Sequence, residues 1–174
     1  MGTGIVRRID ELGRIVIPKE LRRTMHLNVG DEMEIEAVGD SINLKKFNSF
    51  ESVKQVAERV TKLLAETTGA DAMLVDTSCV VLACGEHKKN YQNQIVAGEL
   101  KVAIAARRAV VLHGEDLKQV FEGETADCCY LVFEPIVSGG DVFGGVAILV
   151  NNLPSDVSRA YLKFCAELMG ASIA

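Results

Sequence analysis

With 174 residues, the chain is long enough for one ordinary domain or two small ones. Hydrophobic residues make up 48% and charged residues 25%, and no apolar run approaches the roughly 18 residues that a membrane helix needs. The start of the chain lacks the apolar segment of a secretory signal, so we expect a soluble cytoplasmic protein. The net charge of −5 argues against a nucleic-acid binder whose whole surface is basic.

The charge is distributed unevenly along the chain. Residues 1–28 carry six Lys and Arg side chains against three acidic ones, a net charge of +3. Residues 29–44 carry five acidic side chains and no basic one. A patch acts on a nucleic acid through its local charge rather than through the sum over the protein. The N-terminal segment is therefore predicted to form a localised basic patch on an acidic protein.

Short elements joined by tight turns are predicted for the first 47 residues. Gly13 suits a turn because it can take a positive φ, and Pro18 suits the first position of a helix. In chain order we expect a strand at Ile5–Ile9, a turn at 10–13, a strand at Arg14–Ile17, a helix from Lys19 to about Met25, a turn at 29–31, and a hairpin of strands Met33–Val38 and Ile42–Phe47 across residues 39–41.

This N-terminal segment is predicted to need a second copy of itself. In the hairpin, strand alternation puts Met33, Ile35 and Ala37 on one face and Glu34 and Glu36 on the other. About 47 residues of short strands bury little apolar surface, and neither a disulfide nor a metal site is evident to stabilise them. Oligomerisation remains, so we expect an obligate dimer.

A second domain is predicted to begin at Asn48 and to span residues 48–174. An amphipathic helix follows the boundary at Asn48-Ser49 and runs to about Thr68, where Gly69 ends it. The apolar stripe of this helix either lines a bundle between chains or packs on its own sheet, and both can hold at once. Its members recur at the three-and-four spacing of one helical face: Phe50, Val53, Val56, Ala57, Val60, Leu63 and Leu64.

The rest of the second domain alternates strands and helices. A nearly all-apolar strand at Val142–Val150 is expected to be central and buried, and Ser155 is the expected N-cap of a terminal helix. The elements expected before this strand are strands at Asp71–Asp76 and Val80–Cys84, a helix at Tyr91–Arg107, a strand at Ala109–Leu112 and a polar loop at 113–127 with at most a helical turn. A strand at Cys129–Val137 is expected to form a hairpin with Val142–Val150 across residues 138–141. The terminal helix has the apolar stripe Val157, Tyr161, Phe164, Leu168 and Met169. This order predicts an antiparallel sheet with helices at both chain ends.

The segment from Gly4 to Lys46 resembles the AbrB-type swapped-hairpin DNA-binding domain. VRRIDELGRIVIP and KELRRT carry the resemblance, which runs without a detectable gap. It implies an α+β protein in which two chains exchange hairpins into one interlaced β-barrel. That expectation agrees with the dimer argued from size.

The remaining residues, 48–174, resemble the GAF-type domain that follows an AbrB module in stage V sporulation regulators of spore-forming bacteria. This resemblance lies in layout and domain order, with few sharp motifs. It implies a GAF-like antiparallel sheet flanked by helices, with a sensing or assembly role. Together the two resemblances imply a transcription regulator of sporulation genes that binds double-stranded DNA and is not an enzyme.

Arginine suits DNA because its planar guanidinium grips phosphate or guanine edges with two parallel hydrogen bonds. The resemblance implies DNA contacts at Arg7, Arg14, Arg22 and Arg23. Arg8 is a weaker candidate because strand alternation sends Arg7 and Arg8 to opposite faces. Lys19 is a plausible further phosphate contact. The family tends to bind AT-rich or deformable DNA, which favours readout of DNA shape.

No cofactor or metal site is predicted for the second domain. The cysteines at 79, 84, 128, 129 and 165 form no C-x-x-C pair, and we expect them to be buried thiols. The pairs Gly139-Gly140 and Gly144-Gly145 are expected to serve a turn and close packing, and Lys88, Lys89 and Tyr91 a surface loop. An unidentified small-molecule ligand is possible in a GAF-type domain, but no residue identifies one.

Two other functions and one assembly question stay open. Related swapped hairpins act as antitoxins through an extended C-terminal tail, whereas this chain has a second domain in that place. Some GAF-fold proteins reduce free methionine sulfoxide with cysteines, of which this chain has five. If the stripes of the first and last helices of the second domain meet across chains, two dimers join into a tetramer.

Overall fold

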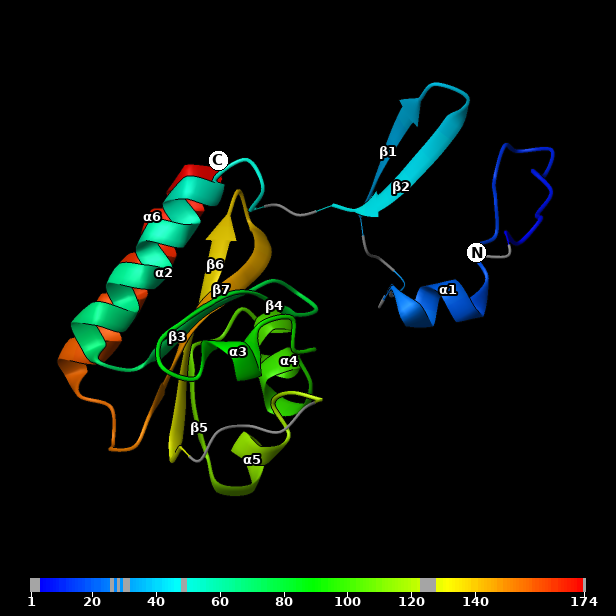
Figure 1. Cartoon of the computed structure of the whole chain (residues 1–174). Helices are drawn as coiled ribbons and strands as arrows, with labels where there is room; N and C mark the ends of the chain where they lie inside the picture. Colours follow the sequence, from blue (N-terminus) through cyan, green and yellow to red (C-terminus); the bar gives the residue numbers. More distant parts are fainter. Residues whose placement is uncertain are drawn as a thin grey trace. The chain divides into compact units, whose positions relative to one another are not determined.

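The protein is described from a computed structural model, which defines residues 4–25, 27, 29, 32–47, 50–122 and 128–173. The chain forms two compact units, Met1–Phe47 and Asn48–Ala174, and each is described by itself (Figure 1). No helix among the described residues has the length and apolar character to cross a membrane. The expected turn at 29–31 and the boundary pair Asn48-Ser49 fall wholly or partly outside the described residues.

The first unit contains one short helix and one hairpin. Helix α1 spans Lys19–Thr24, as predicted, and Pro18 precedes it as the N-cap residue. Strands β1 (Met33–Val38) and β2 (Ser41–Lys46) pair antiparallel with Val38 opposite Ser41. The turn therefore has two residues, Gly39 and Asp40, rather than the three expected, and Gly39 takes a φ of +58°. Two-residue hairpin turns need positive φ because only that twist matches the strands.

The two strands expected at Ile5–Ile9 and Arg14–Ile17 are absent from the described residues of the single chain. This prediction is therefore wrong for the isolated chain. Residues 4–10 and 14–18 are extended but pair with no neighbouring strand. Only the turn between them is closed, by hydrogen bonds from Gly13 N to Asp10 O and from Asp10 N to Arg14 O, both 3.0 Å. A strand needs a partner for its ladder, and no described segment of the chain supplies one.

Exposed apolar side chains dominate the first unit. Val6 is 91% exposed, Val16 74% and Ile35 69%. Among its described residues, Pro18 is the only one that is buried. A unit with these side chains in water lacks the apolar burial that stabilises a fold, at about 25 cal/mol per Å². The single chain therefore leaves the first unit without a core of its own.

The second unit is built on a five-stranded antiparallel sheet in the order β4-β3-β7-β6-β5 (Figure 1). The antiparallel pairing is confirmed, as is the central, buried place of the apolar strand β7. Gly144 has a φ of +135° and leaves no room for a Cβ against the carbonyl of Val75, which confirms a packing role. The strands are β3 (Asp71–Val75), β4 (Val80–Cys84), β5 (Val110–His113), β6 (Tyr130–Ser138) and β7 (Asp141–Val150).

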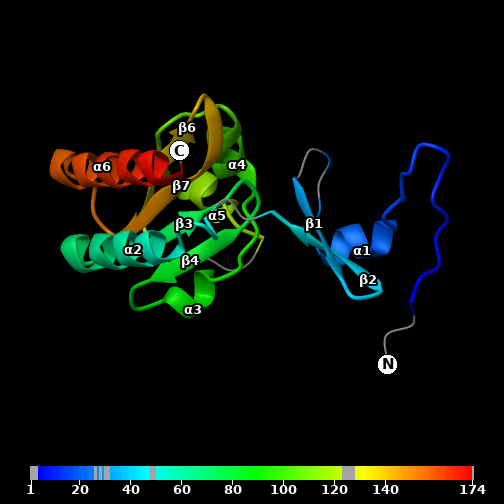
Figure 2. The ribbon, with the colours of Figure 1, turned by 90° about the horizontal axis from the view of Figure 1, so that it is seen from above.

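Helices α2 (Lys54–Thr68) and α6 (Asp156–Ile173) lie side by side on one face of the sheet (Figures 1 and 2). Leu64 of α2 and Leu162 of α6 are buried together with Ile148 of the sheet. Helix α2 begins at Lys54, later than expected, because residues 50–53 form a turn whose Phe50 is buried. Gly69 ends α2 with a left-handed φ of +64°, as predicted.

The stripe predicted for α6 is largely on the wrong face. Leu162, Ala166, Met169 and Gly170 face the sheet, whereas four of the five predicted positions remain exposed. The pattern misled because α6 carries two apolar faces, and the periodicity alone does not say which one meets the sheet. The exposed positions, with their exposed fractions, are Val157 (64%), Tyr161 (48%), Phe164 (62%) and Leu168 (41%).

The other face of the sheet carries three shorter helices, α3 (Lys88–Tyr91), α4 (Gly98–Ala105) and α5 (Gly114–Lys118) (Figure 2). The single helix expected at Tyr91–Arg107 is interrupted, because Asn93 and Gly98 take positive φ and residues 95 and 96 form isolated β-bridges. Lys88, Lys89 and Tyr91 belong to α3 rather than to a loop, and Tyr91 is fully buried. Helix α5 lies within the expected polar loop, whose residues 123–127 fall outside the described residues.

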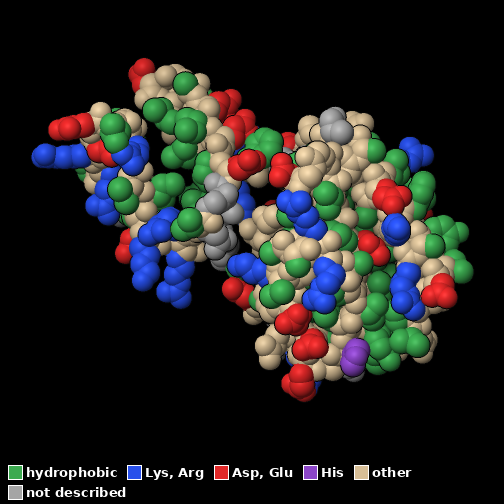
Figure 3. Space-filling model, turned by 180° about the vertical axis from the view of Figure 1, so that it is seen from behind, with side chains coloured by type: hydrophobic (Ala, Val, Ile, Leu, Met, Phe, Trp, Pro, Cys, Tyr) green, Lys and Arg blue, Asp and Glu red, His purple; other side chains and the backbone are tan. Residues whose placement is uncertain are grey.

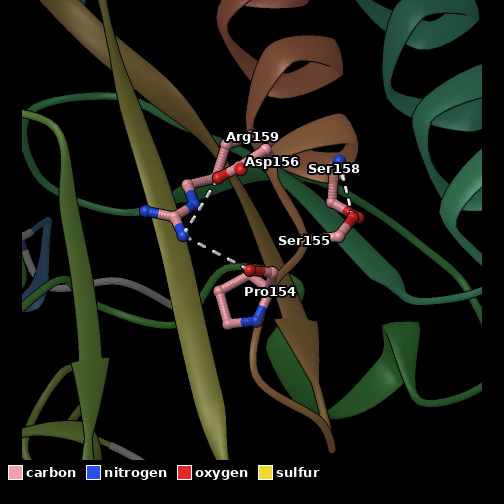
Figure 4. A network of polar contacts seen from close by, with 5 residues as sticks. All are labelled: Pro154, Ser155, Asp156, Ser158 and Arg159. Carbon is pink, nitrogen blue, oxygen red and sulfur yellow. Dashed lines mark hydrogen bonds and ion pairs between the residues drawn. The ribbon is translucent and has the colours of Figure 1, made fainter.

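The start of α6 is fixed by a small polar network (Figure 4). The Oγ of Ser155 accepts the backbone N–H of Ser158 at 3.1 Å, which confirms the predicted N-cap. The guanidinium of Arg159 lies 3.5 Å from the carbonyl of Pro154 and 3.4 Å from the carboxylate of Asp156. The contact with Ser155 satisfies a backbone N–H at the first turn, where such donors have no partner within the helix.

Candidate nucleic-acid interface

Three of the six predicted contact residues lie on α1. Lys19, Arg22 and Arg23 are all exposed, and the spacings of three and four residues put Lys19 beside both arginines on the helix surface. The two arginines fall in the last turn of the helix, where a positive charge is favoured by the helix dipole. Helix α1 thus presents three cations to solvent from a stretch of five residues.

Arg14 is held by the turn that precedes it. The carboxylate of Asp10 accepts the backbone N–H groups of Leu12 at 3.0 Å and of Arg14 at 2.7 Å through one oxygen. The other oxygen lies 3.4 Å from Nε of Arg14. An Asp that binds the backbone two and four residues on is a turn-forming residue. Asp10 is therefore a positioning residue that the sequence analysis missed, although its D-x-x-G context is a turn signal.

Arg7 and Arg8 lie in the extended segment 4–10, and both are exposed. Because this segment has no ladder in the described chain, the structure does not bring them to the cations of α1. Which of the two faces a nucleic acid stays a prediction.

The acidic part of the first unit lies on the hairpin. Glu34 and Lys45 stand opposite each other in the register, and their side chains form an ion pair at 3.0 Å. Figure 3 shows blue Lys and Arg side chains gathered over the part of the first unit that carries α1, and red Asp and Glu side chains toward the hairpin. Most of the acidic side chains thus lie toward the hairpin and most of the basic ones toward α1, although Glu20 lies on α1 and Lys45 on the hairpin.

The five cysteines form no disulfide with one another, and the expectation that they are buried was too strong. Cys129 is exposed, and the other four are partly buried. Burial raises the pKa of the Cys84 and Cys165 thiols above the ordinary value of 9.0. The other prediction for glycines holds, since Gly139 and Gly140 form the β6–β7 turn with positive φ. No cluster of three or more metal-binding side chains occurs among the described residues.

Comparison with known families identifies the class of the protein. A family model described as "Stage V sporulation protein T C-terminal, transcription factor" matches residues 52–171, so the class is that of transcription factors. Stage V sporulation protein T of Bacillus subtilis (strain 168) is 34% identical over 147 residues, which cover 84% of this chain and 83% of that protein. The chain belongs to the stage V sporulation protein T family.

The first unit has relatives of its own. The transition state regulatory protein AbrB of Bacillus subtilis (strain 168) is 56% identical over 45 residues, which are 26% of this chain and 47% of AbrB. The chain therefore spans about half the length of that relative. A second family model, "Antidote-toxin recognition MazE, bacterial antitoxin", matches residues 6–48.

Solved structures establish the fold of the second unit. The blue-light absorbing form of the PixJ GAF domain of Thermosynechococcus elongatus has a TM-score of 0.55 at 10% identity, covering 74% of this chain and 88% of that one. The type II free methionine-R-sulfoxide reductase from Thermoplasma acidophilum has a TM-score of 0.52 at 12% identity, covering 71% and 95%. At these identities the likeness concerns the fold alone, and the expected GAF-like fold is confirmed.

Proposed function

We propose that this chain is a DNA-binding transcription regulator of sporulation genes, in which residues 1–47 bind double-stranded DNA and residues 48–174 sense a ligand or assemble the protein. One observation carries the proposal: the exposed cations of α1 and of the Asp10 turn belong to a segment 56% identical to AbrB. The contact residues are Arg7, Arg14, Arg22 and Arg23, with Lys19 as a phosphate contact and Arg8 as a weaker candidate.

The proposal includes an obligate dimer of the first unit. Apolar side chains such as Val6, Val16 and Ile35 are exposed in the single chain, and a second copy would cover them. A second copy would also supply the ladder that the extended segments 4–10 and 14–18 lack. Two interlaced chains would double the four favoured arginines and give a footprint strong enough to bind phosphates without a recognition helix in the major groove.

The proposal also includes a tetramer, which rests on exposed apolar residues of α2 and α6 in the second unit. The exposed stripe of α6 has the spacing of a coiled-coil seam, and α2 beside it exposes Val56 and Leu63, which are seven residues apart. Exposed apolar side chains at this spacing support packing against the same helices of another chain. We therefore propose that α2 and α6 join two DNA-binding dimers.

The proposal assigns the protein no catalytic role. It places the protein in the cytoplasm, where a regulator has access to chromosomal DNA. Two of the thiols offer little support for a reductase, because burial raises the pKa of Cys84 and Cys165 and so disfavours their reactive thiolate forms. Treatment of the protein with free methionine sulfoxide tests this point. Rapid and stoichiometric oxidation of two cysteines would contradict the proposal.

Binding to an AT-rich duplex, followed by fluorescence anisotropy at several salt concentrations, tests DNA binding. Arg14→Ala and Arg22→Ala should each weaken binding by about tenfold, since a charged contact contributes on the order of 1–3 kcal/mol. Affinity should also fall steeply as salt rises, because bound phosphates release counterions. Arg108→Ala, an exposed arginine of the second unit, is the matched control and should bind as the wild type does. Unchanged affinity in both first-unit variants would refute the proposal.

An antitoxin is the second candidate, because the MazE antitoxin model matches residues 6–48. The folded second unit argues against it, since it stands where an antitoxin of this kind carries an extended tail. Affinity purification of the full chain from its own host tests the alternative. Recovery of a toxin in stoichiometric amount, with no DNA binding, would favour the antitoxin.

A further inference from the structure

An open cavity of about 1040 Å³ lies in the second unit. It occupies the end of the sheet at which β3 begins and β4 and β7 end. Its walls are the last turns of α2, the loop from β4 into α3, and the segment from β7 into α6. The cavity is large enough for a small metabolite, since typical ligand sites hold roughly 300–1,000 Å³. None of the residues proposed to contact DNA lines it.

A carboxylate–imidazole pair is built into the lining. The side chain of Asp71 is 11% exposed, and its two oxygens bind His87 twice: at the backbone N–H, 2.9 Å away, and at Nδ1, 2.8 Å away. Gly85 permits this approach, because it has a φ of +128° and a Cβ there would overlap Oδ1 of Asp71. The hydrogen bond to Asp71 raises the pKa of His87 above its ordinary 6.5. Asp71 thus fixes the ring through Nδ1. When the ring is protonated, Nε2–H remains as a donor for another partner, whereas Nε2 of the neutral ring is an acceptor.

Two lysines reach the same cavity from different helices. Lys62 comes from α2 and Lys88 from α3, and both line the cavity together with the thiol of Cys84. Burial is the main influence on the pKa of Cys84 and raises it, but both ammonium groups act in the opposite direction. The effect of each lysine on the pKa of Cys84 is larger than the opposite effect of Glu58 or of Glu66. At the Cys84 thiol, each lysine therefore has a larger electrostatic influence than either of these two glutamates.

The acidic groups of the lining are mostly occupied. Asp71 binds His87, and Glu66 lies 3.8 Å from the ammonium group of Lys62 in an exposed and therefore weak ion pair. Glu86 also lines the cavity, and its charge adds to the raised pKa of His87. Its carboxylate would oppose an anion, so removing that charge should strengthen binding.

We propose that this cavity binds a small metabolite through an anionic oxygen group, a carboxylate or a phosphate, held by His87, Lys88 and Lys62. The wall formed by Pro154, Ser155 and Ser158 is fixed by the network at the start of α6 (Figure 4), so this side of the site is preformed. The inference deepens the sensing role proposed above and rests on it for its regulatory meaning. Binding itself requires no DNA.

Thermal unfolding and isothermal titration calorimetry of the full chain test the site, with succinate, inorganic phosphate and neutral succinamide as probes. Succinate or phosphate at millimolar concentration should raise the midpoint of unfolding, and succinamide should not. His87→Gln and Lys88→Ala should each weaken anion binding at least about fivefold, and Glu86→Gln should strengthen it. Lys101→Ala, an exposed lysine outside the cavity, is the control and should bind like the wild type.

The pH dependence separates the role of His87 from general charge. Succinate stays ionised between about pH 6.5 and 8.5, since carboxyl pKa values lie near 4. Its binding should therefore weaken as the pH rises through the raised pKa of His87, and His87→Gln should remove this dependence. A phosphate-only response identifies a phosphorylated ligand, and a succinate-only response identifies a carboxylate.

The inference is overturned if neither anion binds, or if binding is unchanged in both His87→Gln and Lys88→Ala. These outcomes are distinct from failure of the proposed function, which is read from DNA affinity in Arg14→Ala and Arg22→Ala. Anion binding without DNA binding would support the anion site and contradict the proposed DNA-binding function. DNA binding without anion binding would contradict only the anion site.

Discussion

The carboxylate of Asp10 holds Arg14 at two points, accepting its backbone N–H at 2.7 Å and lying 3.4 Å from its guanidinium Nε. The backbone bond shapes the turn, and the second contact aims the side chain. Because Asp10 and Arg14 are both exposed, the ion pair itself contributes little, and the turn is the larger effect. One acidic side chain therefore organises a basic contact.

This relationship predicts different results for two substitutions of Asp10. Asp10→Ala removes the acceptor of two backbone N–H groups, and DNA affinity should fall about fivefold, as for a loss of roughly 1 kcal/mol. Asp10→Asn keeps an oxygen acceptor and removes a negative charge near DNA, so affinity should be unchanged or higher. Anisotropy titration of both variants checks this. Equal weakening in the two would mean that the charge matters and the turn does not.

Gly144 should be hard to replace. A Cβ at this position would overlap the carbonyl oxygen of Val75 and would lie 2.7 Å from Cα of Asp76, at a φ of +135°. Gly144→Ala is expected to cost roughly 2–5 kcal/mol through strain and overpacking. Gly139→Ala, at a φ of +58° with open space around it, should cost about 1 kcal/mol. Urea unfolding of both variants gives the comparison, and similar losses would contradict the packing argument.

Phe164 is predicted to govern assembly rather than folding. It is 62% exposed on α6, within the stripe that also contains Tyr161 and Leu168. Phe164→Glu should leave the circular dichroism spectrum unchanged and reduce the sedimentation mass from four chains to two. Val102→Glu, which changes a 52% exposed apolar residue on α4, should keep the larger mass. A wild-type mass of two chains at all concentrations would rule out the tetramer.

Glu134 should destabilise the protein at neutral pH. Burial raises its pKa above the ordinary 4.5, Lys163 opposes this shift, and Glu167 adds to it. A raised pKa in the folded state favours folding below the ordinary value, and this contribution is lost as pH rises through the folded pKa. Glu134→Gln should therefore melt higher than the wild type at pH 7, with the difference shrinking toward pH 4. A difference independent of pH would show that the charge of Glu134 is not the cause.

The second unit was largely predictable because its apolar pattern is set within one chain. The nearly continuous run of β7 predicted a central strand, and Ser155 and Gly69 marked the ends of helices. One error arose because α6 has two apolar faces, and another arose where backbone conformation overrode the pattern. Asn93 and Gly98 interrupt a segment that reads as one helix, since positive φ is incompatible with continuing it.

The first unit was less predictable from one copy of the chain. The extended segments 4–10 and 14–18 have strand-like residues, but a ladder depends on a neighbour that the sequence does not specify. The six cations could be named, yet their grouping could not, because in the proposed dimer it would depend on how two chains pair. The hold of Asp10 on Arg14 was missed for a different reason: Asp10 was assigned to the turn and counted as opposing charge, and its side-chain contacts were not considered.

A unit whose apolar side chains are covered only by a second chain folds by a bimolecular reaction, so its stability depends on protein concentration. Under the proposed dimer, a chain at low abundance would have a folded GAF-like unit and an N-terminal unit that cannot bind DNA. Contacts through α2 and α6 would hold N-terminal segments near one another at a high effective concentration, which compensates for dilution. If the first unit dimerises as proposed, its exposed valines and isoleucines would make the amount of protein in the cell a determinant of DNA binding.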